Sequence, residues 1–221
     1  MPGDAFTTGS PAWSPDGKWV AFDTRRDGNA EVYIISSDGG PERRLTNHPA
    51  VDVVPSWSPD SKWVYLSSDR TGRFELFKVP IEGGEPRQVT TNGGWGSQSS
   101  PDGKFIFYSR TRGTASGAVH ALPRVPLLRM PLDGGEEAKV LDGIVERAWA
   151  VDSNGVWFER ADKPDHGELC FFDFKTGKTI TALTITRPMQ SGMVLSPDGR
   201  RVFWNQLDSQ NSEILLVENF R

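Results

Sequence analysis

A four-residue turn motif recurs along this chain at a nearly constant interval. Ser-Pro-Asp-Gly, or its variant Ser-Pro-Asp-Ser, begins at residues 14, 58, 100 and 196, and a degraded copy occupies 152–155. A second landmark, Asp-Gly-Gly or Glu-Gly-Gly, begins at residues 38, 82 and 133, with a weaker copy at 175. A period of about 40–45 residues is typical of β-propeller blades, each a four-stranded antiparallel sheet. The repeats therefore predict an all-β propeller.

Continuous apolar runs follow the turn motifs, as in 19–22 and 63–66. Such runs are expected because neighbouring blades cover both faces of each sheet. The five copies predict one domain, residues 1–221, with five blades at approximately 10–46, 52–90, 94–141, 146–183 and 190–221. Trp13 and Trp57 take equivalent positions and are expected to pack between blades.

The fifth predicted blade ends after its third strand. Residues 5–8 are a candidate for the missing fourth strand, which would close a five-bladed ring. However, Ser14 of the first turn motif stands only eight positions after Phe6, which is short for a connection that crosses about three strand spacings. Two alternatives therefore stay open: a closed ring of five blades, or part of a larger propeller.

Several strings carry a family resemblance. Pro-Ser-Trp-Ser-Pro-Asp (55–60), Arg-Asp-Gly-Asn-Ala-Glu-Val-Tyr (26–33) and Asp-Gly-Gly-Pro-Glu-Arg-Arg-Leu-Thr (38–46) resemble the WD40-like repeat of TolB-type β-propellers. Residues 214–221 are also similar to the C-terminus of bacterial multidomain proteins in which a propeller follows a winged-helix or Ser/Thr-kinase domain. The resemblance implies a bacterial propeller, leaves open a fragment of a larger multidomain protein, and implies no catalytic residue.

Composition and charge narrow the classes of function. A hydrophobic fraction of 36% with 10% aromatic residues argues against disorder, while 23 glycines and 16 prolines favour short strands joined by turns. The net charge of −4 lacks the basic signature of nucleic-acid binding. No apolar run approaches membrane-spanning length, and no secretory signal pattern precedes the first motif. We expect no nucleic-acid partner and no membrane insertion; a cytoplasmic or periplasmic location stays open.

Catalytic and metal-binding patterns are missing from the sequence. No Gly-x-Ser-x-Gly nucleophile motif occurs, and Cys170 lies in an apolar strand, where it is expected to pack in the core. His48, His120 and His166 match no metal-ligand spacing. The repeated aspartates fit the local hydrogen bonding of their own turns, and 26–31 fits a hairpin loop better than a calcium loop. We therefore predict no catalytic residue, no metal, no cofactor and no enzymatic activity.

Two kinds of loop lie on the same face of a propeller. One joins the fourth strand of a blade to the first strand of the next blade (the d–a connection), and the other joins the second strand to the third (the b–c loop). These loops vary here, whereas the opposite turns are uniform. Arg147 offers a planar donor fork and Trp95 an apolar wall, with loop 111–129 overhanging them. Alternatively, Arg147 pairs with Asp52 or Glu146 and only stiffens the rim. The predicted ligand-binding residues are Asp52, Trp95, Glu146, Arg147 and Gln190.

Three classes of function are compatible with these sequence features. The first is a non-catalytic binding, sensing or protein-interaction module for a protein, peptide or small polar ligand. The second is a TolB-like periplasmic scaffold that docks another envelope protein. The third is a hydrolase or lyase whose carboxylates lie at the channel mouth, where Asp52 and Glu146 qualify.

Overall fold

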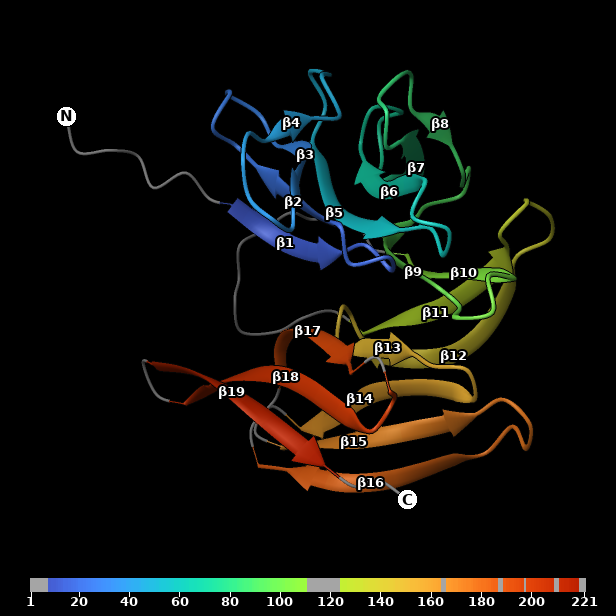
Figure 1. The fold of residues 1–221 in the computed structure, drawn as a ribbon. Coiled ribbons are helices and arrows are strands. Elements are labelled where there is room, and N and C mark those ends of the chain that lie inside the picture. The colour runs from blue at the N-terminus through green and yellow to red at the C-terminus, as the bar shows by residue number, and fades with distance from the viewer. Residues whose placement is uncertain are drawn as a thin grey trace. The chain divides into compact units, whose positions relative to one another are not determined.

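The computed structural model describes residues 8–110, 124–163, 166–186, 189–196, 198–208 and 211–218 (Figure 1). Every regular element in these segments is a β-strand. None of them contains a helix long and apolar enough to cross a membrane.

The first two sheets each contain four consecutive strands, here named a to d in chain order, and neighbouring strands are antiparallel. The first sheet contains β1 (Thr8–Trp13), β2 (Trp19–Thr24), β3 (Glu31–Ser36) and β4 (Arg43–Arg44). The second contains β5 (Asp52–Trp57), β6 (Trp63–Ser68), β7 (Glu75–Pro80) and β8 (Arg87–Gln88). The outer strands β4 and β8 are only two residues long, and a buried threonine, Thr46 or Thr90, follows each of them two residues later.

Three further sheets follow along the chain. The third has the order β12-β11-β10-β9, the fourth β13-β14-β15-β16, and the fifth β17-β18-β19. Their strands are β9 (Trp95–Ser99), β10 (Phe105–Ser109), β11 (Arg124–Pro131), β12 (Ala138–Val145), β13 (Trp149–Val151), β14 (Gly155–Lys163), β15 (His166–Asp173), β16 (Thr179–Ile185), β17 (Met189–Leu195), β18 (Arg201–Asp208) and β19 (Asn211–Glu218).

This architecture confirms the predicted all-β fold of four-stranded antiparallel blades. Five complete blades are not confirmed, because the described residues form four four-stranded sheets and one sheet of three strands. Of the predicted closing strand 5–8, residues 5–7 lie outside the described residues. Thr8 belongs instead to β1, where it pairs with Thr24.

The turn motifs are held together by their own side chains. In the first copy, Ser14 Oγ donates a hydrogen bond to Asp16 Oδ1 at 2.6 Å, and the same oxygen accepts the backbone N–H of Lys18 at 3.1 Å. These hydrogen bonds, the Ser14 one first, lower the pKa of Asp16. The serine–aspartate bond recurs at 2.5–2.6 Å in the copies at 58, 100 and 196. The repeated aspartates are therefore structural, as the sequence predicted.

By the density of its internal contacts the chain divides into two compact units. The first contains Met1–Gly113 and Met130–Glu136, and the second contains Thr114–Arg129 and Glu137–Arg221. The core of the first unit includes Ile34, Trp57 and Leu66. The core of the second includes Leu169 and Met193.

The inner a strands of the first unit stack side by side. Trp57 Nε1 donates to the carbonyl of Ala12 in β1 at 2.9 Å, and Ser99 Oγ in β9 donates to the carbonyl of Trp57 at 3.0 Å. Trp57 is accordingly 5% exposed. The expectation that Trp13 is buried in the same way is wrong, since its side chain is 63% exposed. The reason is that Trp57 packs on the preceding strand β1, whereas no described strand of this unit precedes β1.

Candidate functional site

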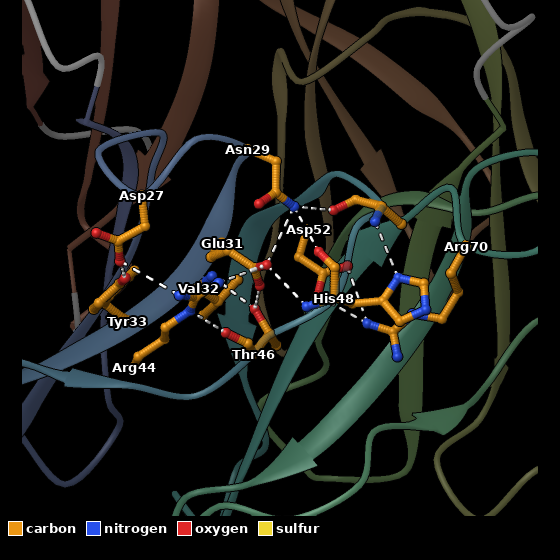
Figure 2. A network of polar contacts seen from close by, with 11 residues as sticks. Asp27, Asn29, Glu31, Val32, Tyr33, Arg44, Thr46, His48, Asp52 and Arg70 are labelled. Carbon is orange, nitrogen blue, oxygen red and sulfur yellow. Dashed lines mark hydrogen bonds and ion pairs between the residues drawn. The ribbon is translucent and has the colours of Figure 1, made fainter.

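A buried glutamate organises the loops at one end of the first sheet (Figure 2). Glu31, the first residue of β3, is fully buried. Its Oε2 accepts a hydrogen bond from Thr46 Oγ1 at 2.5 Å, and its Oε1 accepts the backbone N–H of His48 at 2.9 Å. Thr46 Oγ1 in turn accepts the N–H of Val32 at 2.9 Å. The carboxylate thus ties strand c to the connection between strand d and the next sheet.

Two further donors close this network. Asn29 Nδ2 lies within hydrogen-bonding distance of Glu31 Oε1 (3.1 Å) and of the carbonyls of His48 and Ala50 (2.6 Å each). Arg44 Nη2 lies 2.9 Å from Glu31 Oε1, and its Nε donates to the carbonyl of Thr46 at 2.7 Å. A buried carboxylate requires such pairing because burial removes its hydration. Hydrogen bonds to Glu31, Asn29 and Arg44 therefore hold the d–a connection of the first sheet in place.

The second sheet repeats this network. Glu75, the first residue of β7, is buried, and its Oε2 accepts from Thr90 Oγ1 at 2.6 Å. Thr90 Oγ1 accepts the N–H of Leu76 at 2.8 Å, and the N–H of Gly93 lies 2.9 Å from both carboxylate oxygens. The cation comes from a different place in the sheet: it is Arg73 of the b–c hairpin, whose Nε contacts Glu75 Oε1 at 2.7 Å, instead of an arginine of strand d such as Arg44.

An open pocket lies beside this second network. It has a volume of about 380 Å³ and is lined by Thr71, Gly72, Arg73, Glu75, Gln88 and Thr91. The Arg73 side chain is 56% exposed and its guanidinium donates to the carbonyl of Thr91. We call this cavity the Arg73 pocket. Its lining comes from the b–c hairpin, the start of strand c, strand d and the d–a connection. It therefore lies on the loop face, which the sequence analysis predicts to bind ligand.

The two predicted site residues of the first unit have different surroundings. Asp52 is fully buried at the start of β5, and Arg70 Nη2 contacts its carboxylate oxygens at 3.1 and 2.8 Å. Asp52 therefore belongs to a structural ion pair with Arg70. Trp95 begins β9, is partly exposed, and packs edge-on against Phe74 with ring centroids 4.6 Å apart.

The other three predicted residues belong to the second unit. Glu146 is buried, and Arg147 is partly buried with a left-handed φ of 65°. The carbonyl of Arg147 accepts the N–H of Gly192 at 3.0 Å. Gln190 lies in β17, and its side chain is outside the described part of the chain. The assembly of all five residues into one site stays a prediction, and the overhanging part 111–123 of the predicted loop lies outside the described residues.

The glutamate network is not predicted by the motifs considered above, although the sequence carries a signal for it. Glu31, Glu75 and Glu213 each stand 17 residues after the serine of their turn motif, directly before an apolar strand. A charged residue at a fixed place beside a buried strand indicates a satisfied internal carboxylate. The hairpin loop predicted at 26–31 did not include this role for Glu31.

A second repeated link joins neighbouring sheets within each unit. The fifth residue of strand b accepts a backbone N–H from the inner strand of the following sheet; the pairs are Asp23 with Val54 (3.2 Å), Ser67 with Gly96 (3.0 Å) and Glu159 with Met189 (3.0 Å). Val54 and Gly96 are left-handed, at φ 54° and 52°, where the inner strand bulges. Burial raises the pKa of Glu159 to about 7, because desolvation disfavours its charged form.

Among the described residues, no three His, Cys, Asp or Glu side chains are grouped so that they could hold a metal ion. Cys170 is buried in β15 of the second unit. His48 donates its N–H to Glu31, and its Nδ1 accepts the N–H of Ala50 at 3.0 Å.

Comparisons with known proteins agree with this architecture. The model of the TolB beta propeller domain family matches residues 4–123. The fold is similar to TolB from Acinetobacter baumannii (TM-score 0.79, 17% identity), with 96% of this chain covering 52% of that one. It is also similar to a putative TolB from Agrobacterium tumefaciens (TM-score 0.60, 20% identity), with 99% of this chain covering 92% of that one.

A curated relative matches a shorter segment. The uncharacterized peptidase YuxL of Bacillus subtilis (strain 168) is 50% identical over 40 residues, which are 18% of this chain and 6% of that protein. The chain thus spans about half of the Acinetobacter TolB, and the match covers a small fraction of YuxL.

Proposed function

Because this chain belongs to the TolB β-propeller domain family, we propose that it is a non-catalytic protein-interaction module whose partner binds the loop face. By the loop face we mean, in the first unit, the b–c hairpins 25–30 and 69–74 and the d–a connections 47–51 and 91–93. The observation that carries the proposal is the Arg73 pocket, which opens on this face beside the hydrogen-bonded carboxylate of Glu75.

The two ends of the sheets differ in a way that supports this assignment. At the turn end, the same serine–aspartate bond recurs in the first three sheets with nearly the same length. At the loop end, the same buried glutamate is closed by different side chains, Asn29 and Arg44 in the first sheet and Arg73 in the second. Variable loops on a constant scaffold are where binding residues concentrate. The loop end is therefore the better candidate for recognition.

Two more specific functions stay within this proposal as alternatives. The first is a TolB-like scaffold that docks another envelope protein, which is the same protein-interaction activity placed in the periplasm. A hydrolase or lyase is less well supported, because Asp52, one of its two candidate carboxylates, is fully buried and paired with Arg70. Closure of residues 1–221 into one five-bladed ring, with Asp52, Trp95, Glu146, Arg147 and Gln190 around one opening, also stays a proposal.

The test is a selection followed by mapping. A random dodecapeptide library is selected on the immobilised chain, and enriched peptides are mapped by hydrogen–deuterium exchange. We expect protection of 25–30, 47–51, 69–74 or 91–93, and none in the turn segments 14–18, 58–62 and 100–104. Protection confined to the turn segments, or a library that yields no binder, would contradict the proposal.

A further inference from the structure

We propose that the Arg73 pocket binds a carboxylate carried by an acidic segment of the partner protein. This inference rests on the proposed function and specifies the chemistry of the partner. It is carried by the donors of Arg73, the acceptor of Gln88 and the comparison of two neighbouring sheets.

Arg73 has donors to spare. A guanidinium carries five N–H groups in a planar fork that matches a carboxylate. In the described structure, Nε–H contacts Glu75 Oε1 and Nη2 donates to the carbonyl of Thr91. These contacts hold the fork in place while more than half of the side chain stays exposed. Less side-chain entropy is lost on binding when the cation is already positioned.

Glu75 does not compete strongly with an incoming carboxylate. Its side chain is 1% exposed. Thr90 Oγ1 and the N–H of Gly93 donate to it in addition to Arg73 Nε. Its charge is therefore spread over several internal donors behind the guanidinium, whereas the outward edge of Arg73 faces solvent.

Gln88 supplies the complementary group. Its Nε2 donates to the carbonyl of Thr90 at 2.8 Å, which fixes the side-chain amide. Its Oε1 is then an acceptor suited to a backbone or side-chain N–H. A peptide segment offers a carboxylate and an N–H together, while a free carboxylate such as acetate offers only the first. The pocket chemistry therefore fits a protein segment better than a small anion.

The first sheet shows how the same place can be closed by the chain itself. There Arg44 stands where the second sheet has Gln88, and it contacts the buried glutamate directly. Five residues, 47–51, lie between Thr46 and Asp52, whereas three, 91–93, lie between Thr90 and Gly94. The longer connection places two carbonyls on Asn29. In the second sheet the connection is shorter and Gln88 replaces the arginine, and both differences leave room for the pocket.

The experiment uses the full chain labelled with ¹⁵N and a pool of blocked hexapeptides containing two adjacent acidic residues among Gly, Ser and Ala. A twin pool carries Asn and Gln instead, and acetate is added at equal carboxylate concentration in a third arm. We expect the acidic pool to shift the Arg73 Nε–Hε signal and the amide signals of Gly72 and Gly93. The amide pool should leave them unmoved, and acetate should act at least tenfold more weakly.

Three variants localise the effect. Arg73→Gln should weaken binding of the acidic pool at least tenfold, whereas Lys62→Gln, which removes an exposed cation at the turn end of the same sheet, should change affinity less than twofold. Thr71→Trp fills the pocket from an exposed position and leaves Arg73 and Glu75 in place, so it should abolish binding even if Arg73→Gln disturbs folding. Binding that survives Thr71→Trp, equal shifts by the two pools, or acetate as effective as the peptides would overturn the proposal.

The outcomes also separate this inference from the proposed function. Library-selected peptides that protect the loop face but bind Arg73→Gln and Thr71→Trp unchanged would overturn the carboxylate pocket and leave the interaction module standing. A library without binders, together with silent hexapeptide pools, would overturn both.

Discussion

The buried carboxyl of Glu159 should make the second unit less stable as the pH rises. Glu159 is fully buried at the end of the apolar part of β14. Its Oε1 accepts the N–H of Met189 at 3.0 Å, and a Cβ on Gly167 would come within 2.5 Å of the same oxygen. The surroundings of the carboxyl thus include a peptide N–H and apolar atoms, among them the side chain of Ile185 beside Gly167. Ionisation of Glu159 is therefore unfavourable in the folded chain.

The magnitude follows from the pKa. Burial raises the pKa of Glu159 from 4.5 to about 7. A tenfold change in proton affinity corresponds to about 1.4 kcal/mol, so the shift corresponds to about 3 kcal/mol of unfolding free energy. Because the folded state holds the proton more tightly, this stability is fully present below pH 4.5. It is lost as the pH rises from 4.5 through about 7, and the loss is complete above that.

The assay compares the chain with its Glu159→Gln variant. Because the two units need not unfold together, the readout is the reaction of Cys170, a buried thiol in the same unit, with a thiol reagent across a urea series. Measuring both proteins at each pH cancels the pH dependence of the reagent. We expect the stability of the wild type, relative to the variant, to fall by about 3 kcal/mol between about pH 4.5 and 8.

A carboxylate in the first unit provides the control. Glu82→Gln removes an exposed charge there and should leave the Cys170 profile unchanged. A difference between wild type and Glu159→Gln that stays constant from about pH 4.5 to 8 would show that the carboxyl is hydrated or paired. The account of its burial would then be refuted.

The other predictions concern the scaffold of the first unit. Val54→Gly should raise the free energy of unfolding by about 1 kcal/mol, because a β-branched residue is strained at φ 54°. Val53→Gly, at the neighbouring buried position, should lower it, and a stabilising Val53→Gly would contradict this reasoning. Trp57→Ala should cost about 3–5 kcal/mol in urea unfolding and the exposed Trp13→Ala under about 1, so equal costs would refute the packing difference. Thr90→Val should lower the free energy of unfolding by about 1–3 kcal/mol, because Glu75 and the N–H of Leu76 lose the hydroxyl that both contact. Thr91→Val, at the neighbouring exposed position, should be nearly neutral.

The repeats were enough to predict the sheets because their local chemistry is autonomous. Each turn motif carries its own serine–aspartate hydrogen bond, so a motif such as that at 58–61 forms the same turn wherever it occurs. Strand order then follows from short antiparallel connections. The exposure of Trp13 could not be predicted in this way, because the burial of a strand-a tryptophan depends on a neighbouring strand rather than on its own sequence.

The candidate site was predicted less well for a similar reason. Asp52 was chosen as a polar residue near a strand start, but its carboxylate is already bound by Arg70, which lies 18 residues away. The spacing of Glu75 from its turn motif marks the carboxylate, but its partners come from the b–c hairpin and from the connection after strand d. Such contacts depend on register across the sheet, which a single sequence pattern does not specify.

Comparison between repeats of one chain distinguishes scaffold from recognition more directly than either repeat alone. Glu31 and Glu75 each accept the hydroxyl of an equivalent threonine and a backbone N–H from the following connection, so these contacts are common to the first two sheets. Arg73 departs from that pattern: its counterpart Asn29 is enclosed by two carbonyls, whereas Arg73 remains largely exposed beside an open pocket. The amide of Asn29 contacts the buried glutamate of the first sheet, so a donor other than an exposed guanidinium can take this position. The proposed carboxylate site rests on this exposed guanidinium and on the open pocket beside it.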